Sequence, residues 1–234
     1  MTTTPRYDQL LSLVKDRRSV RHFRPDPIPD DTVERIIEVA RWAPSGFHSQ
    51  PWEFMVIKDK TVKDQITEVV SVAPPAPAMR DEADPSKPRR QPGFGDAPVF
   101  ILLGGDWRAR VQFVGMPEPA REQAEADVFA SSLASAFLYL HLAATSLGLA
   151  SQWCSSAARG RSGDAVRRIL GLPDFIHTYD MIALGYPAED VIPKEVRPLE
   201  DMIHYDACGP DDFRTPEKLE ADGRLFTDWC VRAH

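Results

Sequence analysis

Residues 121–147, REQAEADVFASSLASAFLYLHLAATSL, form the longest segment with helical character in a chain of 234 residues. From Leu133 onward the segment is apolar on nearly every side, which is typical of a helix that other elements surround. Its nearly apolar part, Leu133 to Leu142, is too short to span a bilayer. We therefore expect a long helix in the core of a soluble domain.

Shorter patterns on both sides of this segment predict the remaining elements. Apolar runs bounded by turn residues predict strands at 53–57, 99–103, 150–154 and 179–184. The run Val99 to Leu103 has no polar residue, so we expect a central strand, ended by Gly104 and Gly105. Apolar residues at helical spacing predict helices at 7–17, from Asp30 or Asp31 to near Pro44, at 61–72, and at 164–170 after breaks at Gly160 and Gly163. This order predicts a single domain over 1–234 with a mixed α/β (α+β) layer architecture.

Composition limits the classes of partner. The chain is 43% hydrophobic and 27% charged, with a formal net charge of −7, which argues against nucleic acid or an anionic membrane as the main partner. Its three cysteines form no C-x-x-C pair, and its histidines show no metal-binding spacing, so we expect neither disulfides nor a metal site. The N-terminus lacks the order of a signal peptide, which predicts a cytoplasmic protein.

Several common nucleotide and hydrolase motifs are missing. The Gly-x-Gly at 93–95 precedes a strand, whereas dinucleotide binding needs this motif after a strand and at the start of a helix. The sequence contains neither a P-loop nor a Gly-x-Ser-x-Gly elbow. A Rossmann domain, a kinase and a serine hydrolase are therefore disfavoured.

A basic cluster follows the first predicted helix. Residues 17–21, RRSVR, place three guanidinium groups and a hydroxyl within five residues, enough to hold a phosphate dianion. Taken alone, the cluster is better explained as the basic C-terminus of a helix, which complements the helix dipole. Both interpretations remain open at this point.

A second dense motif lies between a predicted helix and a predicted strand. Residues 44–52, PSGFHSQPW, combine two prolines, a glycine and several hydrogen-bonding groups. Such a loop presents amide groups at fixed positions, which suits the polar edge of a planar ring. The alternative is a turn that ends a helix and anchors Trp52 in the core, and the two roles are compatible.

Together these segments resemble the nitroreductase family of FMN enzymes. The similarity rests on RRSVR at 17–21, APSGFHSQPW at 43–52, ALGYPAE at 183–189 and RPLE at 197–200, in matching order and spacing over roughly residues 6–205. The joint occurrence of four motifs is far more specific than any one of them. The resemblance implies a mixed sheet flanked by helices, with a long central helix and a C-terminal extension, about 206–234, that wraps a partner subunit.

The resemblance also implies the site residues. Arg17, Arg18 and Ser19 would hold the phosphate and ribityl end of FMN, with Val20 beside them and Arg21 at the pyrimidine edge of the ring. Arg197 would complete the phosphate site with Lys194. Pro44, Ser45 and Gly46 would reach the flavin of the partner subunit, so that a homodimer shares its active sites. Gln50 would contact the ribityl chain or the ring edge, and His48 belongs to the same cofactor-binding group. Trp153, Cys154 and Ser155 would lie near the reactive part of the ring.

The function implied is hydride transfer from NADH or NADPH to an acceptor such as a nitroaromatic or quinone, by a ping-pong cycle in one pocket. FMN carries this chemistry, so no certain catalytic side chain is expected. Arg21 should raise the reduction potential of the flavin. Segments at about 71–97 and 106–120 correspond to the lid over the flavin in relatives. Their basic and aromatic residues suggest an aromatic or anionic substrate, although a solvated basic loop explains them equally well.

Other functions stay open. His48 stands where simple nitroreductases often have asparagine, and P-S-G-x-H is similar to the iodotyrosine deiodinase branch. Deiodination is disfavoured because no tyrosine occurs between Tyr7 and Tyr139, where the deiodinase lid needs one; reductive dehalogenation and flavin destruction remain alternatives. A non-catalytic FMN-binding protein and a structural domain without flavin are further possibilities.

Overall fold

The computed structural model describes residues 4–71, 93–191 and 193–232, with side chains up to residue 226. Its residues form two compact units. The first holds residues 4–71 and 93–190, and the second holds the described residues from 191 onward. The single-domain organisation stays a prediction.

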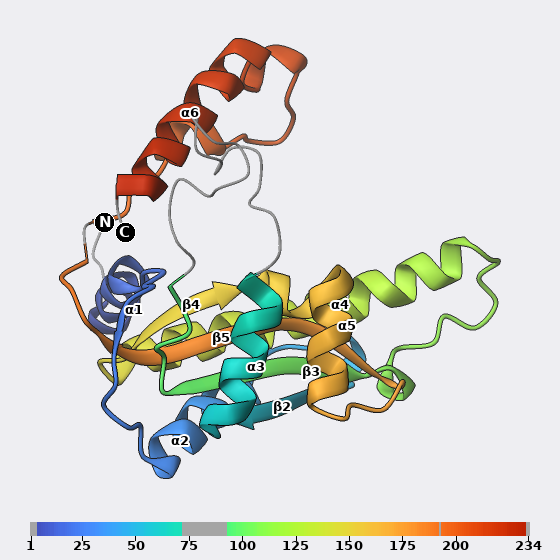
Figure 1. The fold of residues 1–234 in the computed structure, drawn as a ribbon. Helices are drawn as coiled ribbons and strands as arrows, with labels where there is room; N and C mark the ends of the chain where they lie inside the picture. Colours follow the sequence, from blue (N-terminus) through green and yellow to red (C-terminus); the bar gives the residue numbers. More distant parts are fainter. Residues whose placement is uncertain (1–3, 72–92, 192, 233–234) are drawn as a thin grey trace. The chain divides into compact units, whose positions relative to one another are not determined.

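The first unit is built on one five-stranded sheet (Figure 1). Its strands are β1 (Phe23–Arg24), β2 (Trp52–Ile57), β3 (Val99–Asp106), β4 (Ala150–Cys154) and β5 (Ile176–Pro187). The order is β1-β5-β3-β2, β4 also pairs with β5, and all four pairings are antiparallel. β3 lies between β2 and β5, which confirms the central strand predicted from its apolar run.

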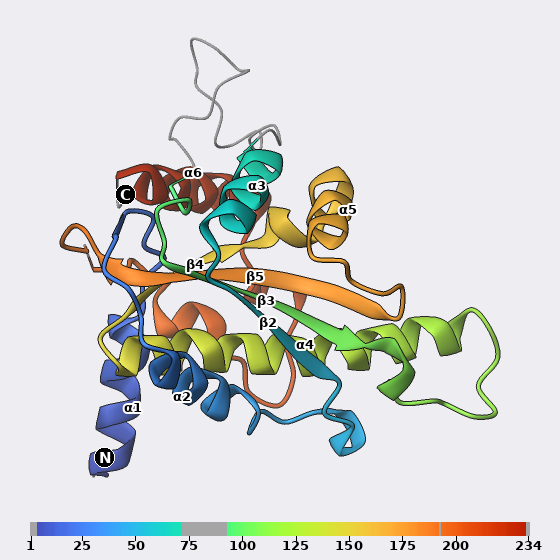
Figure 2. The same cartoon turned by 60° about the horizontal axis from the view of Figure 1, so that its bottom comes forward.

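Five helices accompany the sheet in this unit. They are α1 (Pro5–Asp16), α2 (Asp30–Ala40), α3 (Lys60–Ser71), α4 (Ala120–Ser146) and α5 (Gly160–Ile169). Figure 2 shows α2 and α4 on one face of the sheet and α3 and α5 on the other. Alternate residues of β3 fill both cores: Ile101 packs in the cluster that contains α2 and α4, and Phe100 in the cluster that contains α3 and α5. The mixed α/β layers are as predicted.

Helix α4 matches the predicted long core helix. Ala136, Phe137 and Leu140 are fully buried against the sheet. On length and composition alone this helix could cross a membrane, but half of its most apolar stretch is buried inside the protein. Buried polar groups on it, among them Glu125 and His141, are also typical of a core helix.

The prediction that Gly104 and Gly105 end the central strand was wrong. β3 continues through both to Asp106, with a shift of register between Leu103 and Gly104. A Cβ on Gly105 would lie 2.5 Å from the Phe129 ring, so the glycine lets α4 pack directly on the strand. β5 is likewise longer than the predicted 179–184.

Gly163 does not precede α5 as a break, contrary to the prediction. α5 begins at Gly160, four residues before the predicted start, and Gly163 lies inside it. A Cβ on Gly163 would lie 2.5 Å from the carbonyl carbon of Ala158, so the missing side chain allows close packing. Gly160 has φ +56°, the left-handed region expected of a glycine at a break.

The second unit contains α6 (Pro216–Arg232), which the sequence patterns did not predict. Thr215 accepts a hydrogen bond from the Lys218 N–H through Oγ1 at 3.3 Å, as an N-cap does. Asp222 is nearly buried and binds Arg214 at 3.1 Å and Lys218 at 3.2 Å. The Arg214 pair connects the helix to the segment that precedes it, and the Lys218 pair lies within the helix.

Candidate active site

The basic cluster and the β4 segment lie side by side. After α1 ends, Arg17 adopts an extended conformation, with φ −62° and ψ 125°. Ser19 then forms a parallel bridge with Ser151, and the Val20 N–H donates to the Ser151 carbonyl at 2.9 Å. One chain thus brings together two of the predicted groups, residues 17–21 and residues 153–155.

The arginines of this cluster divide into two roles. Arg18 donates from Nη1 to the carbonyl of Lys15 and, at 2.8 Å, to the carbonyl of Arg17. It thus provides hydrogen bonds to carbonyl groups at the C-terminus of α1, as the helix-terminus interpretation predicts. Arg17 is half-buried, and its burial, with the charge of Arg18, lowers the pKa of its guanidinium. Arginine nonetheless keeps its charge at neutral pH, so Arg17 supplies a partly desolvated cation.

His141 on α4 belongs to the same region, and the sequence analysis did not identify it. Its imidazole is 2% exposed, and its Nδ1 lies 2.7 Å from Oγ of Ser151. Burial, with a smaller effect of the Arg17 charge, lowers the pKa of His141 to about 3, so the ring is neutral at neutral pH. A lone histidine within the apolar run 133–142 was the signal that could have identified it.

Trp153 presents an indole ring at the surface of this region. Its side chain is 43% exposed, stacks on His141 with centroids 5.5 Å apart, and donates from Nε1 to Oδ2 of Asp180 at 2.6 Å. Asp180 is fully buried, and Arg159 approaches it at 3.5 Å. Burial raises the pKa of Asp180, opposed by the Trp153 hydrogen bond and the Arg159 charge.

Cys154 and Ser155 follow on the same strand end. Cys154 is buried on the opposite face of the sheet, among the residues that pack with α3 and α5. Burial raises the pKa of its thiol to about 12, which keeps it protonated and unreactive. Ser155 starts a short 3-10 helix, Ser155–Ala158. Neither residue is placed as a nucleophile.

The loop 44–50 has an unusual backbone. Phe47, His48 and Gln50 have φ values of 50°, 58° and 44°, in the left-handed region that non-glycine residues seldom adopt. The Ser45 hydroxyl accepts the Gln50 N–H at 3.0 Å, and the Gln50 amide lies 2.9 Å from His48 Nε2. Strain of this kind concentrates at binding and catalytic sites.

This loop is fixed on α4 at a distance from the Arg17 region. The Gly46 N–H donates to Ser132 Oγ at 3.0 Å, and a Cβ on Gly46 would lie 2.1 Å from Val128 Cγ1. Ser132 and His141 are nine residues apart, which is about 14 Å along a helix. Pro44 is exposed, as is His48. Within one chain, the 44–50 loop and the region around Arg17 and His141 therefore lie at different positions along α4.

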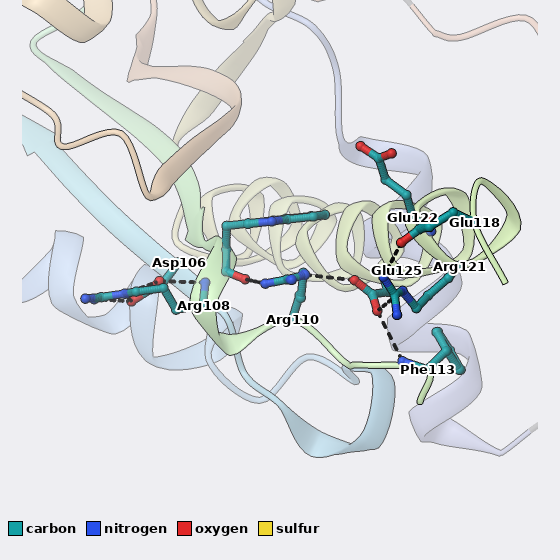
Figure 3. Close-up of polar contacts among 9 residues, drawn as sticks. Asp106, Arg108, Arg110, Phe113, Glu118, Arg121, Glu122 and Glu125 are labelled. Carbon is teal, nitrogen blue, oxygen red and sulfur yellow. Dashed lines mark hydrogen bonds and ion pairs between the residues drawn. The ribbon is translucent and has the colours of Figure 1, made fainter. Parts of the chain in front are cut away.

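Figure 3 shows how the second predicted lid segment is attached to α4. Glu125 is nearly buried and accepts hydrogen bonds from Arg110 Nε at 2.8 Å and from the Phe113 N–H at 3.2 Å. Arg110 lowers the pKa of Glu125, and it also donates to the Trp107 carbonyl at 3.1 Å. Arg108 is likewise held, by Asp106 at 2.6 Å. The arginines of this segment are therefore engaged by carboxylates, which weakens the case for an anionic substrate.

A cavity of about 370 Å³ opens beside this network. It is lined by Trp107, Arg110, Gln112, Val114, Glu118, Arg121, Glu122 and Glu125. Phe113 meets Phe47 edge to face at 6.3 Å, so the segment also touches the strained loop. The first predicted lid segment, about 71–97, contains Arg80, Arg89 and Arg90, and these three arginines lie outside the described residues.

Lys194 and Arg197 belong to the second unit. Lys194 is exposed, and Arg197 donates from Nη2 to the Asp201 carbonyl at 2.7 Å within that unit. Their predicted contact with a flavin phosphate stays a prediction. Within 4–71, 93–191 and 193–232, no three His, Cys, Asp or Glu residues gather as metal ligands would.

Comparisons with known proteins extend this picture. The sequence model of the nitroreductase family matches residues 14–186. A protein of Thermus thermophilus named NADH dehydrogenase is 30% identical over 224 residues, which cover 86% of this chain and 97% of that protein. A shorter stretch of 65 residues is 40% identical to iodotyrosine deiodinase of Danio rerio and covers 28% of this chain and 22% of that protein.

A solved structure shares the fold. Iodotyrosine deiodinase bound to FMN and 3-iodo-L-tyrosine superimposes with a TM-score of 0.64 at 21% identity, covering 85% of this chain and 100% of that one. At this identity the likeness concerns the fold alone. The family match spans most of the chain and agrees with the mixed sheet and long central helix. The chain therefore belongs to the nitroreductase family of oxidoreductases.

Proposed function

We propose that this protein is an FMN-dependent oxidoreductase that passes electrons from NADH or NADPH to an organic acceptor such as a nitroaromatic or quinone. The observation that carries the proposal is the pairing of residues 19–20 with Ser151, which sets the basic cluster beside the strand end with Trp153. Family membership and the names of the relatives support the class of reaction. The acceptor itself is an expectation.

The residues of this region fit a polar cofactor. Buried polar groups normally have hydrogen-bond partners. Among the described residues, His141 Nε2 is buried without one, and the Arg17 charge acts on this imidazole. A ligand with a charged phosphate and a hydrogen-bonding ring would suit this combination of a buried polar atom and a nearby cation. When bound, FMN supplies the ring that accepts and returns a hydride.

The chain's own residues then have separate tasks. Arg17, with Arg18 and Ser19 beside it, holds the phosphate end, and its partial burial strengthens the charge-assisted bond. Arg21 continues beside the end of β4, close enough for its charge to lower the Cys154 pKa, and stabilises negative charge on the ring. His141, which is neutral and buried, lies behind the site and adds no charge to it.

We further propose a homodimer in which the 44–50 loop of one subunit completes the site of the other. The strained loop is exposed at Phe47 (82%), next to the exposed Trp42 (72%). In one chain this loop lies about 14 Å along α4 from His141, so its polar groups suit a site other than its own. The small-molecule substrates would bind at this interface between the two subunits. A cytoplasmic location fits this role and stays part of the proposal.

The visible spectrum of the purified protein tests the function. We expect flavin absorption that NADH or NADPH bleaches without oxygen and that menadione or nitrofurazone restores. Light scattering should give twice the chain mass. A protein that stays colourless after reconstitution with FMN would contradict the proposal, as would a flavoprotein that neither nucleotide reduces. The second outcome would favour a non-catalytic FMN-binding protein.

Reductive dehalogenation is a second candidate. It is favoured by the 65-residue stretch shared with iodotyrosine deiodinase. Incubating the dithionite-reduced holoenzyme with 3-iodotyrosine and with 2-iodophenol separates the two candidates. Iodide release faster than nitrofurazone reduction would favour dehalogenation; iodide at the background rate would reject it.

A further inference from the structure

The indole of Trp153 lies at the edge of the proposed flavin site. Trp153 is two residues along β4 from Ser151, the partner of Ser19 and Val20, which is about 7 Å in a strand. Its side chain is 43% exposed, although every other residue of β4 is buried. A large aromatic surface next to the basic cluster suits contact with a planar ligand.

This indole is held on several sides. Phe137 meets it at 4.6 Å with an interplanar angle of 64°, and His141 stacks on it at 5.5 Å and 20°. The indole N–H donates to Oδ2 of Asp180 at 2.6 Å, and hydrogen bonds to carboxylates are stronger than those between neutral groups. Stacking restrains the plane of the ring, and the hydrogen bond fixes which edge points inward.

Asp180 occupies a costly position for a carboxylate. It is fully buried in β5, next to the fully buried Met181 and Ile182. Burying a charged group is unfavourable unless partners compensate for lost hydration, and here they are the Trp153 indole and Arg159 at 3.5 Å. Its other oxygen, Oδ1, has no hydrogen-bond partner among the described residues. Replacing buried charges by apolar residues is often neutral or stabilising, so the carboxylate points to a role beyond stability.

The local backbone directs Asp180 toward Trp153. In the pairing of β3 with β5, Leu103 faces Asp180 and Gly104 faces Thr178, so Tyr179 is an extra residue in β5. An irregularity of this kind changes the direction of the adjacent side chains. The bulge, the buried carboxylate and the indole therefore form one arrangement.

We propose that Asp180 is a positioning residue that fixes the Trp153 indole as a rigid wall of the flavin site. The inference rests on the proposed function. Trp153 contacts the bound cofactor or the substrate above it, and Asp180 acts only through Trp153. Loss of the carboxylate leaves stacking alone to hold the indole and no longer fixes which edge points inward, so the wall is less preorganised and binding weakens.

The test uses the FMN-bound protein labelled with ¹⁵N-tryptophan. The indole resonance of Trp153 is the one lost in Trp153→Phe. Asp180→Leu removes the acceptor and should move this resonance upfield, change the visible circular dichroism of bound FMN, and raise the Kd for FMN about tenfold. Asp180→Asn keeps an acceptor oxygen and should retain most of each property.

The chain offers a matched control. On α2, the Trp42 indole donates to Glu38 Oε1 at 3.0 Å in an exposed pair. Glu38→Leu removes the same type of bond and should shift the Trp42 resonance while the Trp153 resonance stays in place. Trp153→Phe leaves Asp180 in place and should reproduce the flavin effects, so the test does not depend on the folding of Asp180→Leu.

Two results would overturn the positioning role while the proposed function stands. One is a Trp153 resonance unmoved in Asp180→Leu. The other is a wild-type FMN affinity and dichroism in both Asp180→Leu and Trp153→Phe. A wild-type chain that binds no FMN would instead overturn the proposed function, together with the positioning role of Asp180.

Discussion

Nδ1 of His141 and Oγ of Ser151 lie 2.7 Å apart, and this contact joins the long core helix to the strand beside the basic cluster. Both side chains are almost fully buried. A polar contact inside the core is expensive to break, because each partner would lose a hydrogen bond without gaining water. The contact therefore couples the position of α4 to that of β4.

Replacing His141 should change how stability depends on pH. Burial lowers the pKa of His141 from about 6.5 to about 3 in the folded protein. Between these values the unfolded chain binds a proton that the native state does not. The free energy of unfolding therefore decreases as the pH is lowered, by at most about 1.4 kcal/mol per pH unit for this group. Urea unfolding should show a smaller loss from pH 7 to pH 5 in His141→Gln than in the wild type. Equal losses would contradict the assignment.

Removing the half-buried cation should weaken cofactor binding. Arg17→Ala is expected to raise the Kd for FMN by about 10- to 100-fold, since it deletes a charge-assisted hydrogen bond. Arg24, paired with Asp26 at 3.3 Å and largely exposed, provides the control Arg24→Ala. Quenching of FMN fluorescence on titration measures both. Equal affinities for the two variants would remove Arg17 from the phosphate site.

Arg21→Ala should make the reduction potential of bound FMN more negative. A cation near the ring stabilises the negative charge that reduction creates, so its loss disfavours the reduced form. Equilibration with reference dyes under xanthine and xanthine oxidase measures the potential. An unaltered value would reject this role for Arg21.

Gly46 should be replaceable only together with its neighbour on α4. A Cβ at this position would lie 2.1 Å from Val128 Cγ1 but 3.6 Å from Val128 Cβ. Gly46→Ala should therefore lower the melting temperature and the affinity for FMN, whereas Gly46→Ala with Val128→Ala should recover much of both. A single variant that behaves as the wild type, or a double variant with no recovery, would show that this contact does not fix the loop.

The lid segment should loosen when its carboxylate anchor is neutralised. Glu125→Gln weakens the bonds to Arg110 and Phe113, while Glu122→Gln changes an exposed neighbour on the same helix. We expect faster proteolysis near residues 107–114 and a higher KM for the electron acceptor in Glu125→Gln only. Since Arg110 lowers the pKa of Glu125, the wild-type anchor should persist in mildly acidic solution. Identical digestion of both variants would contradict the anchoring role.

Short-range patterns predicted most of the sheet and helices because they report local burial. The apolar run Val99 to Leu103 predicted the central strand, and 121–147 predicted the core helix, both as found. Gly105 and Gly163 were misread as chain breaks because each is explained by close packing against a residue elsewhere in the sequence, Phe129 and Ala158 respectively. α6 was missed although Thr215 followed by Pro216 is a recognisable helix start.

The candidate site was predictable only in part. The family resemblance identified Arg17 and Trp153, and the structure places their segments side by side. It did not identify His141 or Asp180, because a lone histidine or aspartate in an apolar run shows no partner in the sequence. The pairing of each with Ser151 or Trp153 depends on strands and helices that come together only in the fold.

The spacing along α4 between the Gly46 loop and His141 has a genetic consequence under the proposed shared site. A mixed dimer of one Arg17→Ala subunit and one Gly46→Ala subunit would contain one site with both lesions and one site with neither. Two alleles that each impair both sites of their own homodimer would then restore intact sites when expressed in the same cell, one in each mixed dimer. An enzyme whose site is built from a single chain has no such intragenic complementation.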